Sequence, residues 1–212
     1  MIIAVDGPAA SGKGTLARRL AAHFDYAYLD TGALYRAVGV GVLNTGGDPA
    51  DDAAALSAAQ HLDMKSLNDP QTQAALRTAE AGIAASLVAA KPLVRACILQ
   101  TQRDFAHNPP EGKAGSILDG RDIGTIVCPE AAHKLFVTAS PEVRAERRFL
   151  ELRQDDEKIQ LATVLQDILD RDARDSQRAI APMKQAADAH LLDTSDLSIE
   201  EALTAALAFI AR

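Results

Sequence analysis

Short apolar runs alternate with longer amphipathic stretches along the whole chain. Five of these runs predict strands, at Ile2–Asp6, Ala27–Leu29, Ser116–Leu118, Lys134–Thr138 and His190–Leu192. Continuous apolar strands that are separated by helices are typical of a parallel sheet covered on both faces. The pattern therefore predicts an α/β fold of three layers, with a five-stranded parallel sheet in the middle.

Capping signals and helical periodicity predict the remaining elements. Ser140–Pro141 places an N-cap serine before a first-turn proline, and Ser198–Glu201 forms a capping box. The stretches Asp69–Ala90 and Pro92–Ala106 each indicate a helix. Together they are too large for a simple crossover between strands, so we expect an inserted subdomain.

The first predicted strand runs directly into a glycine-rich loop of the form G-x-x-x-x-G-K-G-T. The loop consists of Gly7, Pro8, Ala9, Ala10, Ser11, Gly12, Lys13, Gly14 and Thr15. Leu16, Leu20 and Phe24 follow at four-residue spacing and predict a helix. Strand, loop and helix are the three parts of a phosphate-binding P-loop, in which backbone N–H groups and the helix N-terminus attract an anion. We interpret the segment as a nucleotide site in preference to a chance turn, with Lys13 reaching the outer phosphates.

The residue after Lys13 indicates which class of P-loop protein the loop resembles. The commonest P-loop has Ser or Thr at this place, where the hydroxyl holds magnesium. Here Gly14 stands there and Thr15 follows. The form G-x-x-x-x-G-K-G-T resembles the loop of nucleoside monophosphate kinases, which implies phosphoryl transfer to a small molecule.

Composition argues against several other classes. With 212 residues, 48% of them apolar, we expect one globular unit with a substantial core, and the net charge of −7 argues against a nucleic-acid partner. Cys97 and Cys128 lack metal-ligand spacing and are expected to be small core residues in a reducing compartment. No apolar run approaches the ~20 residues of a membrane span. Because a strand is predicted from Ile2, we expect no signal peptide. We expect a cytoplasmic protein without a membrane partner.

Further polar stretches follow predicted strands or begin helices, where an open parallel sheet binds its ligands. They are Leu29–Arg36, Ile117–Thr125, Arg171–Arg178, and Ser86 with Arg95. Taken alone, most of them are explained by helix starts and surface ion pairs; Arg171 with Asp175, for example, has i,i+4 spacing. With a P-loop in the same chain, a phosphate-binding role for these stretches is favoured over a purely structural one. Phosphoryl transfer between two polyanions requires many positive charges, and arginine binds phosphate in a bidentate way.

The combination of motifs is similar to that of the bacterial cytidylate (CMP/dCMP) kinases. Beside the P-loop it comprises D-T-G-A-L-Y-R from Asp30, D-G-R-D-I-G-T from Asp119 and R-D-x-x-D-x-x-R-x-x-x-P from Arg171. The last two are specific to that family, and the resemblance runs from Ile2 to the last helix.

The resemblance implies a role for each matching position. The P-loop would hold the ATP phosphates, with Arg147 on the donor side, and Lys13, Arg121, Arg174 and Arg178 would assist the transfer. The positions implied for CMP are Thr31, Arg36, Ser86, Arg95, Arg121, Asp122, Arg171, Asp175 and Arg178. Among these, Arg36, Arg121 and Arg178 would hold the phosphate. Ser86, Arg95 and Asp122 would read cytosine, whose N4 amine is a donor that a carboxylate accepts.

The resemblance also implies a division of the chain. The core would comprise residues 1–36, 107–150 and 180–212, the acceptor-nucleotide insert about 37–106 and a helical lid about 151–179. The charged segment Arg153–Lys158 is then a hinge or tip of the lid, where its pattern alone indicates a solvated turn. The insert is shorter than that of the family, because the residues of one β-hairpin are missing around Ser66–Thr78.

We expect a monomeric enzyme that phosphorylates CMP and dCMP directly from ATP, with Mg2+ held mainly through the nucleotide phosphates. Its partners are small-molecule nucleotides, and no protein-only metal site is predicted. Another small P-loop kinase, for AMP, shikimate or a sugar acid such as gluconate, is the alternative of the same class. A nucleotide-binding switch without turnover is the alternative of another class, but the N-K-x-D motif of guanine readers is absent from the sequence.

Overall fold

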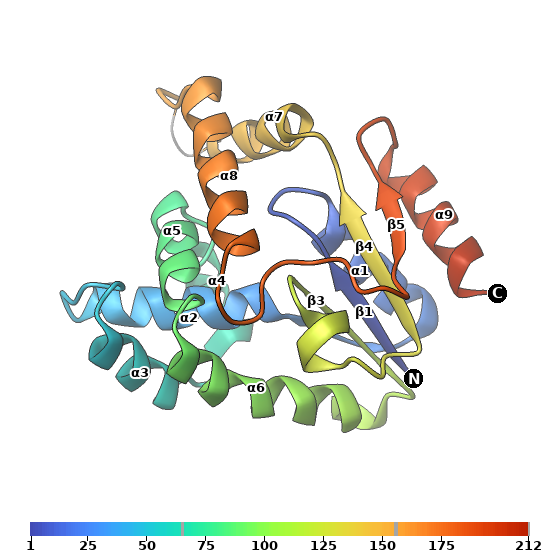
Figure 1. Cartoon of the computed structure of the whole chain (residues 1–212), viewed down its shortest axis with the longest axis horizontal. Coiled ribbons are helices and arrows are strands. Elements are labelled where there is room, and N and C mark those ends of the chain that lie inside the picture. The colour runs from blue at the N-terminus through green and yellow to red at the C-terminus, as the bar shows by residue number, and fades with distance from the viewer. Residues whose placement is uncertain (65, 155–156, 212) are drawn as a thin grey trace. The chain divides into compact units, whose positions relative to one another are not determined.

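The computed structural model describes residues 1–64, 66–154 and 157–211, and it divides into two compact units. The first unit comprises Met1–Leu29 with Arg103–Arg212, and the second comprises Asp30–Gln102. Figure 1 shows the helices and strands of both units.

The first unit is built on a five-stranded sheet with the order β2-β3-β1-β4-β5. The strands are β1 (Ile2–Asp6), β2 (Ala27–Asp30), β3 (Ser116–Gly120), β4 (His133–Thr138) and β5 (His190–Asp193). β1 runs parallel to both β3 and β4, and β4 runs parallel to β5. All five predicted strands are therefore confirmed, with boundaries within two residues. Since β1 is central, its carboxyl end delivers the P-loop to the middle of the sheet.

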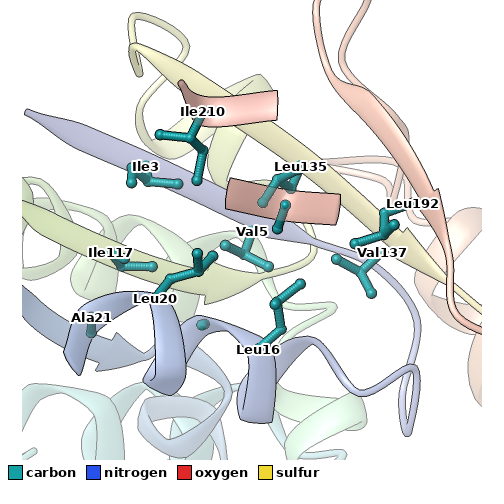
Figure 2. Packing of buried hydrophobic residues seen from close by; sticks show 12 residues of the cluster. Ile3, Val5, Leu16, Leu20, Ala21, Ile117, Leu135, Val137, Leu192 and Ile210 are labelled. Carbon is teal, nitrogen blue, oxygen red and sulfur yellow. The ribbon is translucent and has the colours of Figure 1, made fainter. Parts of the chain in front are cut away.

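Two helices pack their apolar faces on this sheet. Leu16 and Leu20 of α1 (Lys13–Phe24) point toward the strands, and Ile210 of α9 (Ile199–Ile210) joins the same core (Figure 2). Every residue of β3 is buried, so both faces of this strand are covered, as the continuous apolar pattern predicts. The core consists of Ala, Leu, Ile and Val because the chain has no Trp and few aromatics.

Two helices of the first unit begin at the predicted capping serines. The Ser140 hydroxyl accepts a hydrogen bond from the Val143 N–H at the start of α7 (Pro141–Leu152), and both bonds of the predicted capping box are present at α9. α7 packs beside α8 (Leu161–Ser176) through a small apolar cluster (Figure 1). A 3-10 turn, η2 (Pro110–Gly112), and one π-helical turn, η3 (Ile123–Val127), complete the unit. The predicted turn at Arg153–Lys158 lies partly outside the described residues.

The second unit is helical over its described residues after Asp30. Its elements are α2 (Thr31–Asn44), α3 (Asp52–Gln60), η1 (Ser66–Asn68), α4 (Pro70–Ala75), α5 (Ala79–Val88) and the greater part of α6 (Pro92–His107). The prediction of one helix over Asp69–Ala90 is wrong, because the chain turns between α4 and α5. Thr78 adopts an extended conformation there, and its hydroxyl caps α5 by accepting a hydrogen bond from the Ala81 N–H at 3.1 Å. A threonine N-cap inside an Ala-rich periodic run thus ends one helix and begins the next.

Both cysteines are free thiols, as expected; Cys128 is buried and Cys97 half-buried. Among the described residues, no single helix has the length and apolar composition to cross a membrane. Of these residues, α5 and Pro92–Gly112 reach the required length and apolar composition only when taken together, and the two segments are bent by 100° at the break between them.

Candidate functional site

The P-loop connects β1 to α1 and curls tightly. Gly7, Ala10 and Gly12 all have positive φ, at 148°, 57° and 86°. A Cβ on Gly7 would lie 2.0 Å from the Val137 carbonyl oxygen of β4, so no other residue fits there. Such a succession of left- and right-handed residues turns backbone N–H groups toward one point, which makes an anion-binding concavity.

Two side chains of the loop are withdrawn from solvent. Lys13 begins α1 and is only 8% exposed, with its Nζ donating to the Pro8 carbonyl at 3.3 Å. Ser11 is fully buried, and its Oγ has no hydrogen-bond partner among the residues that the structure describes. A buried hydroxyl without a partner is uncommon in folded proteins. This one fits a loop that completes its hydrogen bonds with a ligand.

The end of β3 places a carboxylate beside the loop. Asp119 is buried and accepts a hydrogen bond from the Tyr28 hydroxyl at 2.7 Å. A Cβ added to Gly14 would lie 3.0 Å from Oδ2 of Asp119, so glycine leaves room for the carboxylate where other P-loops carry Ser or Thr. Carboxylate and hydroxyl oxygens are the ligands that Mg2+ prefers, and Asp119 and Thr15 supply both kinds.

Asp6, the last residue of β1, ties the P-loop strand to the turn that follows β3. Its two carboxylate oxygens accept hydrogen bonds from the N–H groups of Ile123 and Gly124, each at 2.8 Å. Burial raises the pKa of Asp6 to about 7; the two N–H donors and Arg121 oppose this rise, and Asp122 adds to it. The carboxylate therefore holds the segment directly after Arg121 and Asp122, and Asp122 itself is buried.

Arginines surround one buried carboxylate at the end of α8. Asp175 is 1% exposed; it accepts a hydrogen bond from Arg121 Nε at 2.9 Å and also pairs with Arg178. Burial by itself raises the pKa of Asp175, but Arg121, Arg178 and Arg171 together outweigh it and hold the pKa below its usual value. Three guanidinium groups against one carboxylate leave an excess of positive charge, which suits an anionic ligand.

Two further predicted arginines take different positions. Arg147 of α7 donates to the Thr194 hydroxyl at 3.0 Å and to its carbonyl at 2.7 Å, and Thr194 donates to the Ser11 carbonyl at 2.9 Å. Arg147 is thereby linked to the P-loop through Thr194. Arg174 lies exposed on the last turn of α8.

The remaining predicted residues belong to the second unit. Thr31 is buried at the start of α2, and Ser86 is buried in α5. Arg36 forms an ion pair with Asp30 at 2.6 Å, and the Asp30 carboxylate also caps α2. Arg95 of α6 is 7% exposed.

Arg95 is held inside the second unit by two contacts. Its Nη1 donates to the Ala89 carbonyl at 3.3 Å, and its guanidinium lies 5.5 Å from the centre of the Tyr35 ring. A cationic group over an aromatic face is an attractive arrangement and keeps the planar guanidinium in one orientation.

A model of the cytidylate kinase family matches residues 3–212. The chain belongs to the cytidylate kinase family. It is 60% identical over 211 residues to a cytidylate kinase of Rhodospirillum rubrum, covering 100% of this chain and 97% of the relative. A cytidylate kinase of Xanthobacter autotrophicus is 59% identical, with 99% and 97% covered, and one of Azorhizobium caulinodans is 57% identical, with 100% and 98% covered.

Comparison with solved structures supports the fold. An uncharacterized protein from Eubacterium ventriosum matches with a TM-score of 0.56 at 12% identity, covering 100% of this chain and 98% of that one. Membership of the cytidylate kinase family makes the protein a phosphotransferase, and the family resemblance read from the motifs is confirmed.

Sequence reasoning passed over several residues that the structure places in or beside the site. They are Asp6, Arg144 and Thr194. A signal existed for Asp6, because it is an aspartate at the carboxyl end of an apolar strand. Arg144 and Thr194 carried none, since their contacts come from elements far apart in the sequence. Asp119 and Asp172 stand within the motifs that begin at Asp119 and Arg171.

Proposed function

We propose that the protein transfers the γ-phosphoryl group of ATP to CMP and dCMP, forming CDP and dCDP. The observation that carries this proposal is the Asp175 cluster, which gathers Arg121, Arg171 and Arg178 in the same unit as the P-loop. One anion site is built of backbone N–H groups and the other of arginines. Two polyanionic substrates require such a pair.

The donor side uses the loop Gly7–Thr15. Its backbone holds the β- and γ-phosphates, Lys13 leaves the Pro8 carbonyl for a phosphate oxygen, and Ser11 Oγ gains the partner that it lacks. Mg2+ is held mainly by the phosphates and water, with Thr15 and Asp119 as the oxygen donors of this chain. When bound, it neutralises charge on the transferring phosphoryl group. Arg147 supports the loop through Thr194.

On the acceptor side, each residue keeps the role that the family motifs imply. Arg121 and Arg178, with Arg36, hold the CMP phosphate, and Asp175 with Arg171 binds the sugar hydroxyls. Asp122, Ser86 and Arg95 read cytosine, and Thr31 lies by the acceptor nucleotide. These assignments rest on the family motifs together with the burial of Asp122, Ser86 and Arg95. Arg174 and Arg178 stabilise negative charge on the phosphoryl group as it moves.

The transfer is direct and in line. The acceptor oxygen of CMP is already anionic, so the reaction needs neither a covalent enzyme intermediate nor a general base. Positioning and charge neutralisation supply the catalysis. The lid, about 151–179 with 155 and 156 outside the described residues, excludes water so that ATP is not hydrolysed.

A coupled assay of ADP release tests this function, with CMP, dCMP, UMP, AMP, shikimate and gluconate as acceptors at saturating Mg2+-ATP. We expect CMP and dCMP to be the preferred acceptors, and Lys13→Ala to remove the signal. Higher kcat/KM for AMP, shikimate or gluconate would overturn the assignment. Nucleotide binding without turnover for any acceptor would support a non-catalytic switch.

A further inference from the structure

Arg144, a buried residue in the first turn of α7, joins three parts of the first unit through one guanidinium group. It is 3% exposed. Its Nε donates to the Ala139 carbonyl at 2.9 Å, and its Nη1 donates to the Ala9 carbonyl of the P-loop at 3.3 Å. Its Nη2 lies 2.6 Å from Oδ2 of Asp172 on α8. The donor loop and the helix of the acceptor arginines are therefore bridged by a single side chain.

An apolar contact runs parallel to this polar bridge. Ala145, Val164 and Ile168 form a buried cluster where α7 meets α8, and Ala10 of the P-loop packs against it. Adjacent P-loop residues thus touch this helix pair, one through its carbonyl and the other through its methyl group. Displacement of the loop cannot leave α7 and α8 unaffected, because packed interiors do not deform continuously.

Asp172 lies one helical turn before Asp175, the carboxylate that Arg121 and Arg178 contact. A connected path therefore leads from the Ala9 carbonyl through Arg144 and Asp172 to the Asp175 cluster. The Asp172 side chain is 23% exposed and its Oδ1 has no hydrogen-bond partner among the described residues, so Oδ2 supplies the counter-charge of the buried Arg144 guanidinium. Removing one partner of such a pair is costly.

We propose that Arg144 is a positioning residue that couples the P-loop to α8, so that binding of one nucleotide strengthens binding of the other. The inference rests on the proposed function, in which ATP occupies the P-loop and CMP the arginine cluster. Arg144 touches neither nucleotide; it acts through the Ala9 carbonyl and Asp172. Coupling of this kind is reciprocal, so each nucleotide raises the affinity for the other by the same factor.

Calorimetry of the full chain tests the coupling, with CMP titrated in the absence and presence of saturating Mg2+-AMP-PNP. We expect the wild type to bind CMP about tenfold more tightly when AMP-PNP is present. Asp172→Asn and Arg144→Lys should reduce this ratio to under about twofold. Asp172→Asn is nearly isosteric. Asp172 is linked to the P-loop through Arg144, which donates to the Ala9 carbonyl.

Glu146→Gln is the matched control, because Glu146 lies on α7 two residues after Arg144 and is exposed. It should keep the wild-type ratio. Loss of thermal stability alone, with the ratio unchanged in folded Asp172→Asn, would overturn the proposal and leave Arg144 a structural residue. A wild-type ratio of one would overturn it as well.

Hydrogen exchange in the wild type gives a measurement that needs no variant. AMP-PNP alone should slow amide exchange in α8 (Leu161–Ser176), and unchanged exchange there would also overturn the coupling. Failure of the proposed function looks different, because the wild type would then not bind CMP under either condition.

Discussion

Asp175 accepts a hydrogen bond from Arg121 across 54 residues of sequence, with 2.9 Å between Oδ2 and Nε. The contact fastens the turn after β3 to the last turn of α8. Because Asp175 is buried and also pairs with Arg178, it holds both arginines in place before any phosphate arrives. Such preorganisation reduces the cost of binding a charged ligand.

Replacing Asp175 by Asn should weaken CMP binding and destabilise the fold, the latter by about 3 kcal/mol, because buried arginines lose their counter-charge. The pKa of Asp175 is lowered on folding from 3.8, so its charged form stabilises the protein above about pH 4, and this contribution is lost as pH falls through the folded pKa. The difference in unfolding free energy between wild type and Asp175→Asn should therefore be constant from pH 5 upward and shrink below pH 4. Urea titrations at several pH values measure it, and a difference that does not shrink in acid would show that Asp175 is not ionised in the folded state.

Asp6 should show the opposite dependence on pH. Its folded pKa of about 7 lies above the ordinary value of 3.8, so the folded protein binds more protons than the unfolded chain between these pH values. The contribution of this group to stability is full below pH 4 and is lost as pH rises to about 7. The asparagine of Asp6→Asn cannot titrate. The difference in unfolding free energy between the wild type and this variant should therefore narrow as the pH rises from 4 to about 7.

Melting temperatures of wild type and Asp6→Asn at pH 5, 6, 7 and 8 would measure the effect. Kinetics at pH 8 give a second readout, because the Asn amide can accept only one of the two N–H bonds from Ile123 and Gly124. We expect KM for CMP to rise more than KM for ATP, since the displaced turn carries Arg121 and Asp122. Parallel changes in both KM values would contradict a specific hold on this turn.

Lys13→Ala should remain folded and lose most of its turnover. A charge-assisted contact to phosphate contributes roughly 1.5–3 kcal/mol in the ground state, and we expect at least that loss in the transition state. Arg19→Ala on the same helix is a suitable control, because Arg19 is half exposed and pairs on the surface with Glu200. Steady-state kcat beside the melting temperature separates the two effects, and a folded Lys13→Ala with near-normal kcat would remove Lys13 from the mechanism.

Asp122→Ala should shrink the preference for CMP over UMP, chiefly through loss of CMP activity. Cytosine offers the N4 amine as a donor to the carboxylate, whereas uracil presents O4, an acceptor. A buried site that pairs a polar group rejects an analogue that leaves it unpaired by up to about 10⁴-fold, and Asp122 is 5% exposed. The ratio of kcat/KM for the two acceptors measures this. An unchanged ratio would mean that Asp122 anchors the turn and that other groups read the base.

The parts of the molecule that the sequence by itself determined are those set by local chemistry. Apolar runs such as Ile2–Asp6 became strands, the serines at 140 and 198 capped their helices, and the segment Gly7–Thr15 formed the turn out of β1 and the start of α1. In each case the relevant interactions lie within a few residues. The helix break at Thr78 was not predicted. Alanines within a few residues on both sides continue the helical pattern, and the capping role of Thr78 shows only in its extended backbone conformation.

Tertiary structure decided which charges meet. Spacing alone favoured a surface ion pair between Arg171 and Asp175, but folding buries Asp175 and brings Arg121 from the end of β3 to it. The bridge from Arg144 to Ala9 and Asp172, and the hold of Asp6 on Gly124, likewise join segments distant in the chain. No periodicity encodes such contacts, because a buried charge takes its partner from whichever element the sheet order and helix packing place beside it.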